Sequence, residues 1–247
     1  MMDSVSVRFA EARSAALAEE RDTHAVGTLG EKPVHRTLKY FLDNDPAHHE
    51  VKHLGYVCDV KNEQGIFEIQ TRAFDRLCPK LEKMLSDSHV TVIYPIIKER
   101  TLNWLSPENG ELISSRKVSK KGKISDALPE LSKIKKYLGH ENLTFRIYLL
   151  SAEEYRLLDG YGAEKKRRST KFTIVPTELF EVLEFKTRDE LRFLLPEKLP
   201  DVFGAKEFYS AIGMKGRRAY FSLSLMLDFG FIKKVGKKGN AYIYEKT

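Results

Sequence analysis

The segment at positions 56–72, YVCDVKNEQGIFEIQTR, constrains the fold of this chain more than any other part of its sequence. Two apolar runs flank the polar break NEQG, and this pattern predicts a β-hairpin with a tight turn. If the turn centres between Glu63 and Gln64, Asp59 lies directly opposite Glu68. Directly opposed side chains share one face, with Cβ atoms about 4.5–5.5 Å apart. The hairpin therefore predicts two carboxylates that face each other.

Two opposed carboxylates repel each other, so they need a compensating charge. A divalent cation provides it, because Mg²⁺ takes oxygen ligands from one or two carboxylates. The alternative is that both side chains face solvent, since a slip of one residue in register turns each to the other face. Glu31 favours the metal, because it lies on the side of the helix predicted at 32–42 that carries Val34 and Leu38. Its own alternative is a carboxylate that stabilises the helix N-terminus through the helix dipole.

Helical and strand patterns alternate along the first hundred residues. An alanine-rich helix at 7–21 precedes the helix at 32–42, which has Pro33 in its first turn. The elements that follow are strands at 49–54, 56–61 and 65–72, a helix at 74–85 and an apolar strand at 90–97. The order is thus helix, three strands, helix, strand.

This arrangement resembles the core of the PD-(D/E)XK nuclease superfamily, which includes many restriction endonucleases and Holliday-junction resolvases. The resemblance covers residues 29–98 and rests on Glu31 in the first helix, then Asp59, then Glu68-Ile69-Gln70 in the next strand. It implies an α/β (α+β) fold with a restriction-endonuclease-like mixed sheet flanked by helices. It also implies that Asp59, Glu68 and Glu31 bind Mg²⁺ (or Mn²⁺), with the Ile69 carbonyl as a further ligand.

The sequence departs from this family at Gln70, where the family usually has a lysine. A glutamine lacks the positive charge that stabilises the reacting phosphate or helps to deprotonate a water. Lys61, on the same predicted face as Asp59, could replace that lysine, as could Lys32. Arg72 follows on the face of Gln70 and is a candidate phosphate contact. The implied reaction is phosphodiester hydrolysis in which the metal activates a water.

The positive charge of the chain is concentrated near its C-terminus. Residues 204–247 carry nine Lys and Arg and three Asp and Glu, so this segment accounts for +6 of the net charge of +7. Charge concentrated on one small domain indicates a polyanionic partner. The predicted elements there are helices at 203–212 and 217–229, a turn between them, and a hairpin around the glycine-rich 236–240.

Helix, turn, helix and hairpin resemble the winged-helix family of DNA-binding domains. The resemblance implies that the second helix enters the major groove of DNA and that the hairpin, or wing, contacts the backbone. The residues then expected on the exposed side of this helix or its approach are Lys215, Arg217, Arg218 and Ser222, with Lys237 and Lys238 at the wing tip. The alternatives are a solvated charged face and a winged helix used for protein contacts.

The middle of the chain, 99–195, is predicted as an elaboration of the nuclease-like core. Its expected elements are a hairpin of 102–105 and 111–113, basic loops at 116–123 and 165–171, a helix at 125–138 and a buried strand at 143–150. Ser151 and Glu154 fit a capping box and predict a further short helix. The Pro-bracketed segment 195–200 is the best linker candidate. The predicted domains are therefore 1–28, 29–98, 99–195 and 201–247.

The cysteines and the apolar segments bear on the cellular compartment. Cys58 and Cys78 lack zinc-ligand spacing and predict buried free thiols in a reducing compartment. The N-terminus lacks the apolar core of a signal peptide, and no segment approaches the roughly 20 apolar residues needed to span a bilayer. We expect a cytoplasmic protein without a membrane partner.

The sequence thus favours a Mg²⁺-dependent DNA endonuclease whose DNA is delivered by a C-terminal winged helix. The main alternative is a non-catalytic DNA-binding regulator whose first domain dimerises or senses a ligand. A third interpretation is a partner-binding protein that binds no nucleic acid. A homodimer is compatible with the first interpretation, because many nucleases of this type cut both strands as dimers.

Overall fold

A computed structural model of the protein describes residues 4–22, 32–160 and 169–247. The chain forms two compact units. The first comprises Met1–Ile69, Pro95–Gly122 and Tyr148–Val182, and the second comprises Gln70–Tyr94, Lys123–Ile147 and Leu183–Thr247. The units therefore interleave along the chain, whereas the sequence analysis divided it into successive segments.

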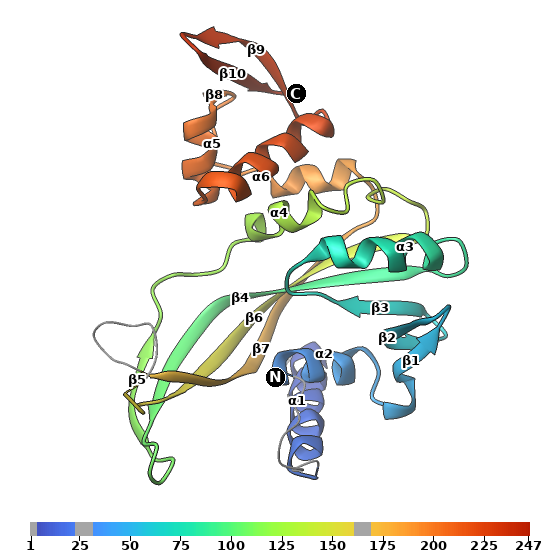
Figure 1. Ribbon diagram of the computed structural model, residues 1–247, viewed down its shortest axis with the longest axis vertical. Coiled ribbons are helices and arrows are strands. Elements are labelled where there is room, and N and C mark those ends of the chain that lie inside the picture. The colour runs from blue at the N-terminus through green and yellow to red at the C-terminus, as the bar shows by residue number, and fades with distance from the viewer. Residues whose placement is uncertain (1–3, 23–31, 161–168) are drawn as a thin grey trace. The chain divides into compact units, whose positions relative to one another are not determined.

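The fold is mixed α/β, as expected, and is built on a sheet that has seven strands within the described residues. The strand order is β1-β2-β3-β4-β6-β7, and β5 pairs with β4 (Figure 1). The strands are β1 (His49–His53), β2 (Tyr56–Asn62), β3 (Gly65–Ile69), β4 (Val90–Leu105), β5 (Leu112–Lys117), β6 (Leu143–Leu157) and β7 (Thr170–Phe185). Strands β4, β6 and β7 each pass from one unit to the other.

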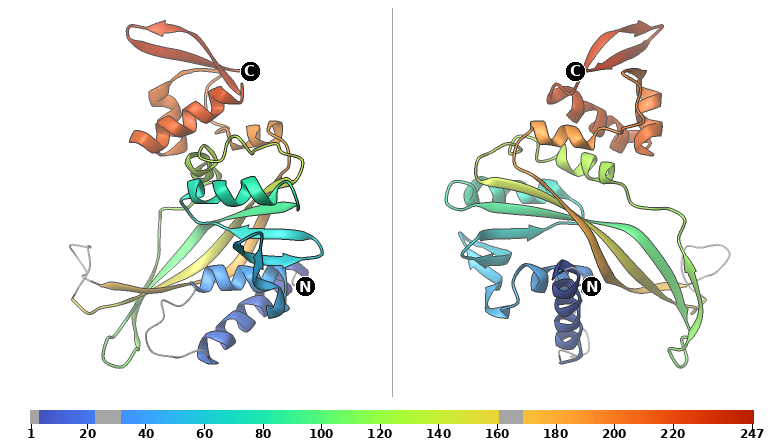
Figure 2. Two further views of the ribbon diagram at one scale, coloured as in Figure 1. Left: turned by 45° about the vertical axis from the view of Figure 1, so that its right-hand side comes forward. Right: turned by 180° about the vertical axis from the view of Figure 1, so that it is seen from behind.

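Two helices, α1 (Ser4–Asp22) and α2 (Pro33–Leu42), belong to the first unit. Pro33 is tolerated in the first turn of α2, because the N–H that it lacks has no partner inside a helix. The Phe41 ring centroid lies 5.6 Å from that of Phe9 in α1 and 6.1 Å from that of Tyr148 in β6. These contacts join both helices to the sheet, and Figure 2 shows the helices side by side next to the strands of their unit. Helix α2 contacts both β2 and β3.

The core of the second unit is aromatic. Its helical segments include η2 (Phe74–Leu77), α3 (Cys78–Met84), η3 (Ile124–Ala127), α4 (Leu128–Leu131) and η4 (Asp189–Leu194). Phe74 is fully buried, and its ring centroid lies 5.6 Å from that of Tyr94 and 6.2 Å from that of Phe145. Phe145 in turn stacks on Phe185 at 6.2 Å. The rings thus connect the η2–α3 segment to strands β4, β6 and β7.

Replacing Phe74 by alanine is expected to lower the free energy of unfolding by about 3–5 kcal/mol, because the lost ring leaves a cavity in a close-packed core. Phe193→Ala is the matched control, since Phe193 is 58% exposed and contacts Phe185 only at 6.4 Å. Phe193→Ala should lower the free energy of unfolding by less than about 1 kcal/mol. Urea unfolding of the full chain measures both values. Equal costs for the two variants would contradict the packing of Phe74.

The C-terminal module, Val202–Lys246, belongs to the second unit. It contains β8 (Val202–Gly204), α5 (Ala205–Ile212), α6 (Gly216–Asp228), β9 (Ile232–Lys238) and β10 (Ala241–Lys246), and its strands form an antiparallel sheet in the order β8-β10-β9. Phe203 packs at 6.1 Å from Phe208 and at 5.9 Å from Tyr244. Gly213 ends α5 at φ 70°, a left-handed conformation that glycine adopts readily. The predicted order of helix, turn, helix and hairpin is therefore present.

Several predicted elements differ from the structure. The capping-box helix at Ser151 and Glu154 is wrong: β6 continues to Leu157, because the Ser151 hydroxyl pairs across strands with Thr177 at 2.6 Å. Strand β7 was not predicted. Of the loop predicted at 165–171, residues 165–168 lie outside the described residues, and Thr170 and Lys171 belong to β7. The apolar strand predicted at 90–97 runs on to Leu105 and includes the first arm of the predicted hairpin.

Smaller differences concern element ends. The strand predicted at 65–72 ends at Ile69, and the loop predicted at 116–123 begins inside β5, which ends at Lys117. The helix predicted at 125–138 is regular only to Leu131. Phe203 lies in strand β8 rather than in a helix, because it pairs with Tyr244 of β10. The segment predicted as a linker forms a turn inside the second unit, where Leu199 is buried.

Candidate functional site

The β2–β3 hairpin has the register that the sequence predicted. Val60 pairs with Phe67 and Lys61 pairs with Ile66. The side chain of Asn62 accepts a hydrogen bond from the Gln64 N–H at 2.9 Å, which stabilises the turn. The pairing of β2 with β3 reaches Val60 and Phe67, so the opposition of Asp59 and Glu68 stays a prediction.

Asp59 is held in place by two groups. Its Oδ2 atom accepts a hydrogen bond from the Ile69 N–H at 2.7 Å and lies 3.3 Å from Nε2 of His35. The carboxylate thus turns toward the end of β3 and toward α2. His35, which the sequence analysis did not select, joins the candidate site through this contact.

Glu68 is buried, with 3% of its surface exposed. An ionised carboxylate at such depth requires a balancing cation or several hydrogen bonds, because leaving water is costly for a charge. The alternative given by the sequence, in which both carboxylates face solvent, does not describe Glu68. Asp59 and Glu68 together offer a half-buried and a buried carboxylate on neighbouring strands.

The other predicted site residues are placed as follows. Glu31 lies outside the described residues. Lys61 is half-buried on β2. Gln70 belongs to the second unit, where its side-chain amide donates to the Arg72 carbonyl at 2.6 Å. Arg72 lies in a bend after β3 and is exposed, so the prediction that it continues the strand face of Gln70 is wrong. Within the described residues, no three His, Cys, Asp or Glu side chains are grouped to hold a metal ion.

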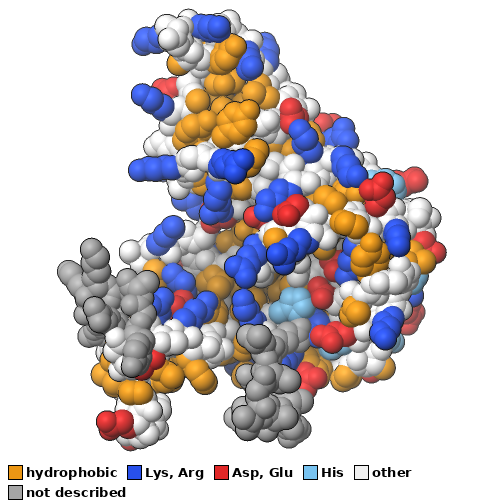
Figure 3. Space-filling view, in the orientation of Figure 1, with side chains coloured by type: hydrophobic (Ala, Val, Ile, Leu, Met, Phe, Trp, Pro, Cys, Tyr) orange, Lys and Arg blue, Asp and Glu red, His pale blue; other side chains and the backbone are white. Residues whose placement is uncertain are grey.

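The start of helix α6 carries a basic cluster. Lys215 is its N-cap in extended conformation, and Arg217 and Arg218 follow in the first turn. All three are exposed, and within the part of the chain that the structure describes none of them forms an ion pair. Figure 3 shows Lys and Arg side chains gathered over the C-terminal elements, with hydrophobic side chains exposed among them.

Ser222 does not lie on the exposed side of α6, so its predicted DNA contact is wrong. The residue is fully buried, and its hydroxyl donates to the Arg218 carbonyl at 2.9 Å. The outer face carries Tyr220 and Phe221 instead, which are 59% and 40% exposed. Helical spacing from Arg217 gives these positions directly, since residues three and four apart lie on one face. The sequence analysis overlooked them because aromatic side chains favour a core.

Lys237 and Lys238 lie at the end of β9, next to the turn of the β9–β10 hairpin. They pair with Tyr242 and Ala241, so the strand extends further toward the tip than predicted. The ammonium groups of Lys234 and Lys237 lie 4.3 Å and 4.8 Å from the centre of the Tyr242 ring. These cation–π contacts hold two lysines on one side of the hairpin.

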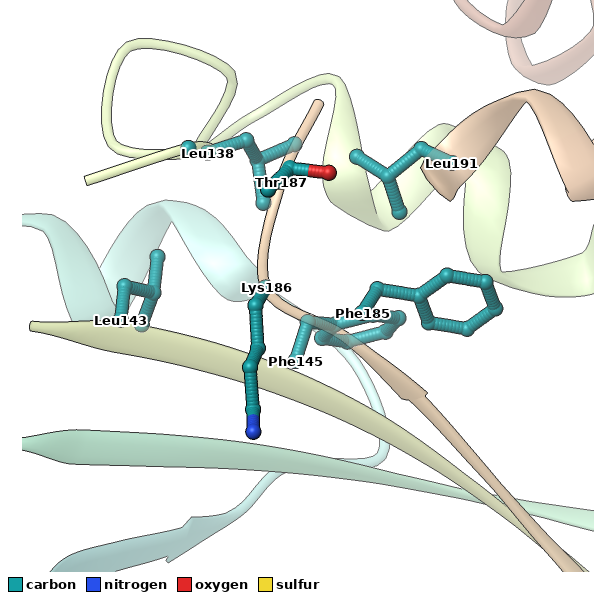
Figure 4. A pocket seen from close by; sticks show the side chains of 8 residues that line it. Leu138, Leu143, Phe145, Phe185, Lys186, Thr187 and Leu191 are labelled. Carbon is teal, nitrogen blue, oxygen red and sulfur yellow. The ribbon is translucent and has the colours of Figure 1, made fainter. Parts of the chain in front are cut away.

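A small apolar hollow in the second unit offers no chemistry of its own. It is lined by Leu138, Gly139, Leu143, Phe145, Phe185, Lys186, Thr187 and Leu191 (Figure 4). Of the described residues that line it, Lys186 alone titrates, and its ammonium pairs with Glu184 at 3.0 Å. The hollow is therefore a packing feature rather than a candidate site.

Comparison with known proteins gives the family but no activity. A family model described as Domain of unknown function (DUF8091) matches residues 32–186, more than half of the chain. The chain belongs to this family. The matched range begins just before α2 and ends just after β7, so it contains the whole seven-stranded sheet and excludes the C-terminal module.

A relative from Treponema pallidum (strain Nichols), named only as an uncharacterized protein, is 29% identical over 225 residues. The alignment covers 90% of this chain and 87% of the relative, so the similarity extends beyond the family range. No solved structure matches. None of the helices in the described residues is long and apolar enough to cross a membrane.

Proposed function

We propose that the protein is a metal-dependent DNA endonuclease related to the PD-(D/E)XK nucleases. The observation that carries the proposal is the β2–β3 hairpin, in which Val60 pairs with Phe67 and Asp59 accepts a hydrogen bond from the Ile69 N–H, next to the buried Glu68. The order α2, β1, β2, β3, α3, β4 is also the one that the resemblance requires. Glu68 is buried, and catalysis at a metal is a reason to retain a buried acid beside Asp59.

The residues present fit Mg²⁺ or Mn²⁺. Asp59 and Glu68 supply carboxylate oxygens and Ile69 supplies a carbonyl, and hard oxygen donors are the ligands that Mg²⁺ prefers. When bound, the ion supplies an activated water and charge stabilisation at the leaving oxygen. The Ile69 N–H and His35 orient the Asp59 carboxylate. Lys61, on the same face of β2 by strand alternation, is the nearest candidate in sequence for the charge that Gln70 lacks.

The C-terminal module delivers the DNA in this proposal. Its β8-α5-α6-β9-β10 order resembles a winged helix, in which the second helix enters the major groove. Lys215, Arg217 and Arg218 supply contacts at the start of α6, while Lys237 and Lys238 contact phosphates from the wing.

On this account Tyr220→Ala weakens DNA binding about tenfold, because an aromatic ring on the outer face of α6 makes apolar contact with base edges. Ser222→Ala is the matched control on the same helix. Ser222 is buried, and its hydroxyl contacts only the Arg218 carbonyl and the Met214 sulfur inside the module, so DNA affinity should change less than about twofold. Fluorescence anisotropy with a labelled duplex compares the two. A larger loss for Ser222→Ala than for Tyr220→Ala would contradict the assigned faces of α6.

A second function is favoured by Gln70. Its neutral amide donates to the backbone carbonyl of Arg72, so it cannot supply the positive charge of the usual lysine. A non-catalytic DNA-binding regulator is therefore the alternative. In that case the carboxylate pair has a structural role.

Titration calorimetry with Mn²⁺ separates the two functions. The endonuclease proposal requires that the full chain binds Mn²⁺ and that Asp59→Ala loses this binding. Glu63→Ala is a control, because Glu63 is exposed in the turn of the same hairpin. DNA binding without any Mn²⁺ binding, or Mn²⁺ binding unchanged in Asp59→Ala, would overturn the catalytic proposal.

A further inference from the structure

A β-bulge in the β9–β10 hairpin brings two lysines to one tyrosine. Lys237 pairs with Tyr242 and Lys234 pairs with Tyr244, so β9 has two residues between these pairs where β10 has one. Residues three apart in a regular strand point to opposite faces, and the extra residue of a bulge reverses this alternation. Lys234 and Lys237 therefore share a face with Tyr242, and their ammonium groups lie 4.3 Å and 4.8 Å from the centre of its ring.

The Tyr242 ring is exposed, although the same face of β10 is buried further along. Tyr244 lies on that face by strand alternation, is buried and stacks on Phe203 at 5.9 Å. Tyr242 lies beyond this core and is 42% exposed. A single exposed aromatic residue is common on protein surfaces, so only the groups around Tyr242 can indicate a ligand.

The groups around Tyr242 are positively charged. Lys233, the neighbour of Lys234 in β9, pairs with Glu245 at 2.7 Å. Lys234 and Lys237 contact the aromatic ring instead, and neither forms an ion pair among the described residues, which include the whole C-terminal module. Two positive charges are thus placed for an anionic ligand beside an exposed aromatic ring.

An unpaired nucleotide matches both features. Its base presents a flat face that stacks on an aromatic ring, and its phosphates pair with cations. Stacking of a base on an aromatic ring is stronger than a cation–π contact at an exposed site, and the flexible stem of lysine lets the ammonium group move from the ring to a phosphate. A duplex offers the edges of its paired bases rather than their faces, so it does not provide this contact.

We propose that Tyr242 stacks on an unpaired base while Lys234 and Lys237 contact the adjacent phosphates. The hairpin extends beyond α5 and α6 (Figure 1). A substrate that engages both the hairpin and α6 therefore carries single-stranded DNA next to the duplex that α6 contacts. The stacking site itself rests on the hairpin, while the assignment of its ligand to DNA rests on the proposed function.

Anisotropy titrations of the full chain in EDTA, which withholds the metal ion, test the stacking site. The labelled DNAs are a blunt duplex, the same duplex with a single-stranded overhang, and the same duplex with an abasic overhang, which keeps the phosphates and lacks the bases. The unchanged chain should bind the overhang duplex about tenfold more tightly than the abasic-overhang duplex. Equal affinity for these two DNAs would overturn the proposal.

Tyr242→Ala should abolish this preference and change the affinity for the blunt duplex less than about twofold, because only the stacking ring is lost. Tyr242→Phe should keep the preference, since a phenyl ring also stacks on a base. Val235→Ala is the matched control, because Val235 is 47% exposed in the same hairpin and has no ring. Thermal unfolding checks that each variant folds. A folded Tyr242→Ala variant that still prefers the overhang duplex would exclude stacking on Tyr242.

Lys234→Gln tests the phosphate contact. It should lower the slope of log affinity against log salt on the overhang duplex by about 0.7, the value for one phosphate of a single strand. Lys233→Gln is the control, because Lys233 pairs with Glu245. Its slope should remain that of the unchanged chain. Equal slopes in the two variants would overturn the phosphate contact of Lys234.

Cleavage assays with Mg²⁺ separate the stacking site from the proposed function. If the overhang duplex is preferred through Tyr242 but no DNA is cut, the stacking site stands and the endonuclease proposal fails. If DNA is cut while Tyr242→Ala keeps the preference of the unchanged chain, the stacking site alone is overturned. If none of the labelled DNAs is bound even at low salt, both proposals are overturned and the exposed ring favours a protein partner.

Discussion

Replacing Lys215, Arg217 and Arg218 together by glutamine is expected to weaken binding of duplex DNA roughly a hundredfold at moderate salt, and to lower the salt slope by about 3. All three side chains are exposed around the start of α6, whose N-terminus adds its own partial positive charge. None contributes to the core, so the variant should fold as the unchanged chain does. Anisotropy titrations across a salt series measure the affinity and the slope.

The matched control for this triple variant is Lys233→Gln with Lys246→Gln. Both lysines belong to the same module, but they pair with Glu245 at 2.7 Å and with Asp201 at 3.5 Å. Their charges are partly compensated, so the affinity should fall by less than about fivefold. An equal loss of DNA affinity in the triple variant and in the double variant would mean that net charge alone governs binding and that the start of α6 is not a specific DNA contact.

Glu68→Gln is expected to slow metal-dependent DNA cutting about a thousandfold while it preserves DNA binding. Glutamine keeps the size of the side chain, and the change removes one carboxylate oxygen and its charge from the buried end of the proposed metal site. Single-turnover cleavage rates with Mg²⁺ measure the effect.

Glu63→Gln is the control for Glu68→Gln. Glu63 is exposed in the turn of the same hairpin, so its charge should not matter for cutting. If the Glu68→Gln variant cuts DNA at a rate within about tenfold of that of the unchanged chain, Glu68 does not belong to the proposed site.

The parts of the structure that sequence predicted are those that local chemistry determines. The NEQG turn fixes the register of β2 and β3, so the pairing of Val60 with Phe67 followed from neighbouring residues alone. Helix α2 followed in the same way from Pro33 and the spacing of Leu38 and Phe41.

The parts that sequence missed depend on distant residues. Ser151 and Glu154 have the spacing of a helix cap, but pairing with β7 and the arginines holds them in a strand. Tertiary pairing outweighed a local preference there. Arg100 and Glu154 lie far apart in the chain, so no local pattern predicts their ion pair. Ser222 was predicted on the exposed face of its helix because it is polar. It lies on the buried face, where its hydroxyl donates to the Arg218 carbonyl of the same helix.

Cleavage of supercoiled and branched DNA by the purified full chain, with Mg²⁺, with Mn²⁺ and with EDTA, tests the central claim most directly. The account predicts cutting with either metal ion, none in EDTA, and loss of cutting in both Asp59→Ala and Glu68→Gln. The opposite result is that DNA is bound but stays intact with both ions, and that the two variants bind it as tightly as the unchanged chain does. That result would contradict the endonuclease proposal and favour a DNA-binding regulator.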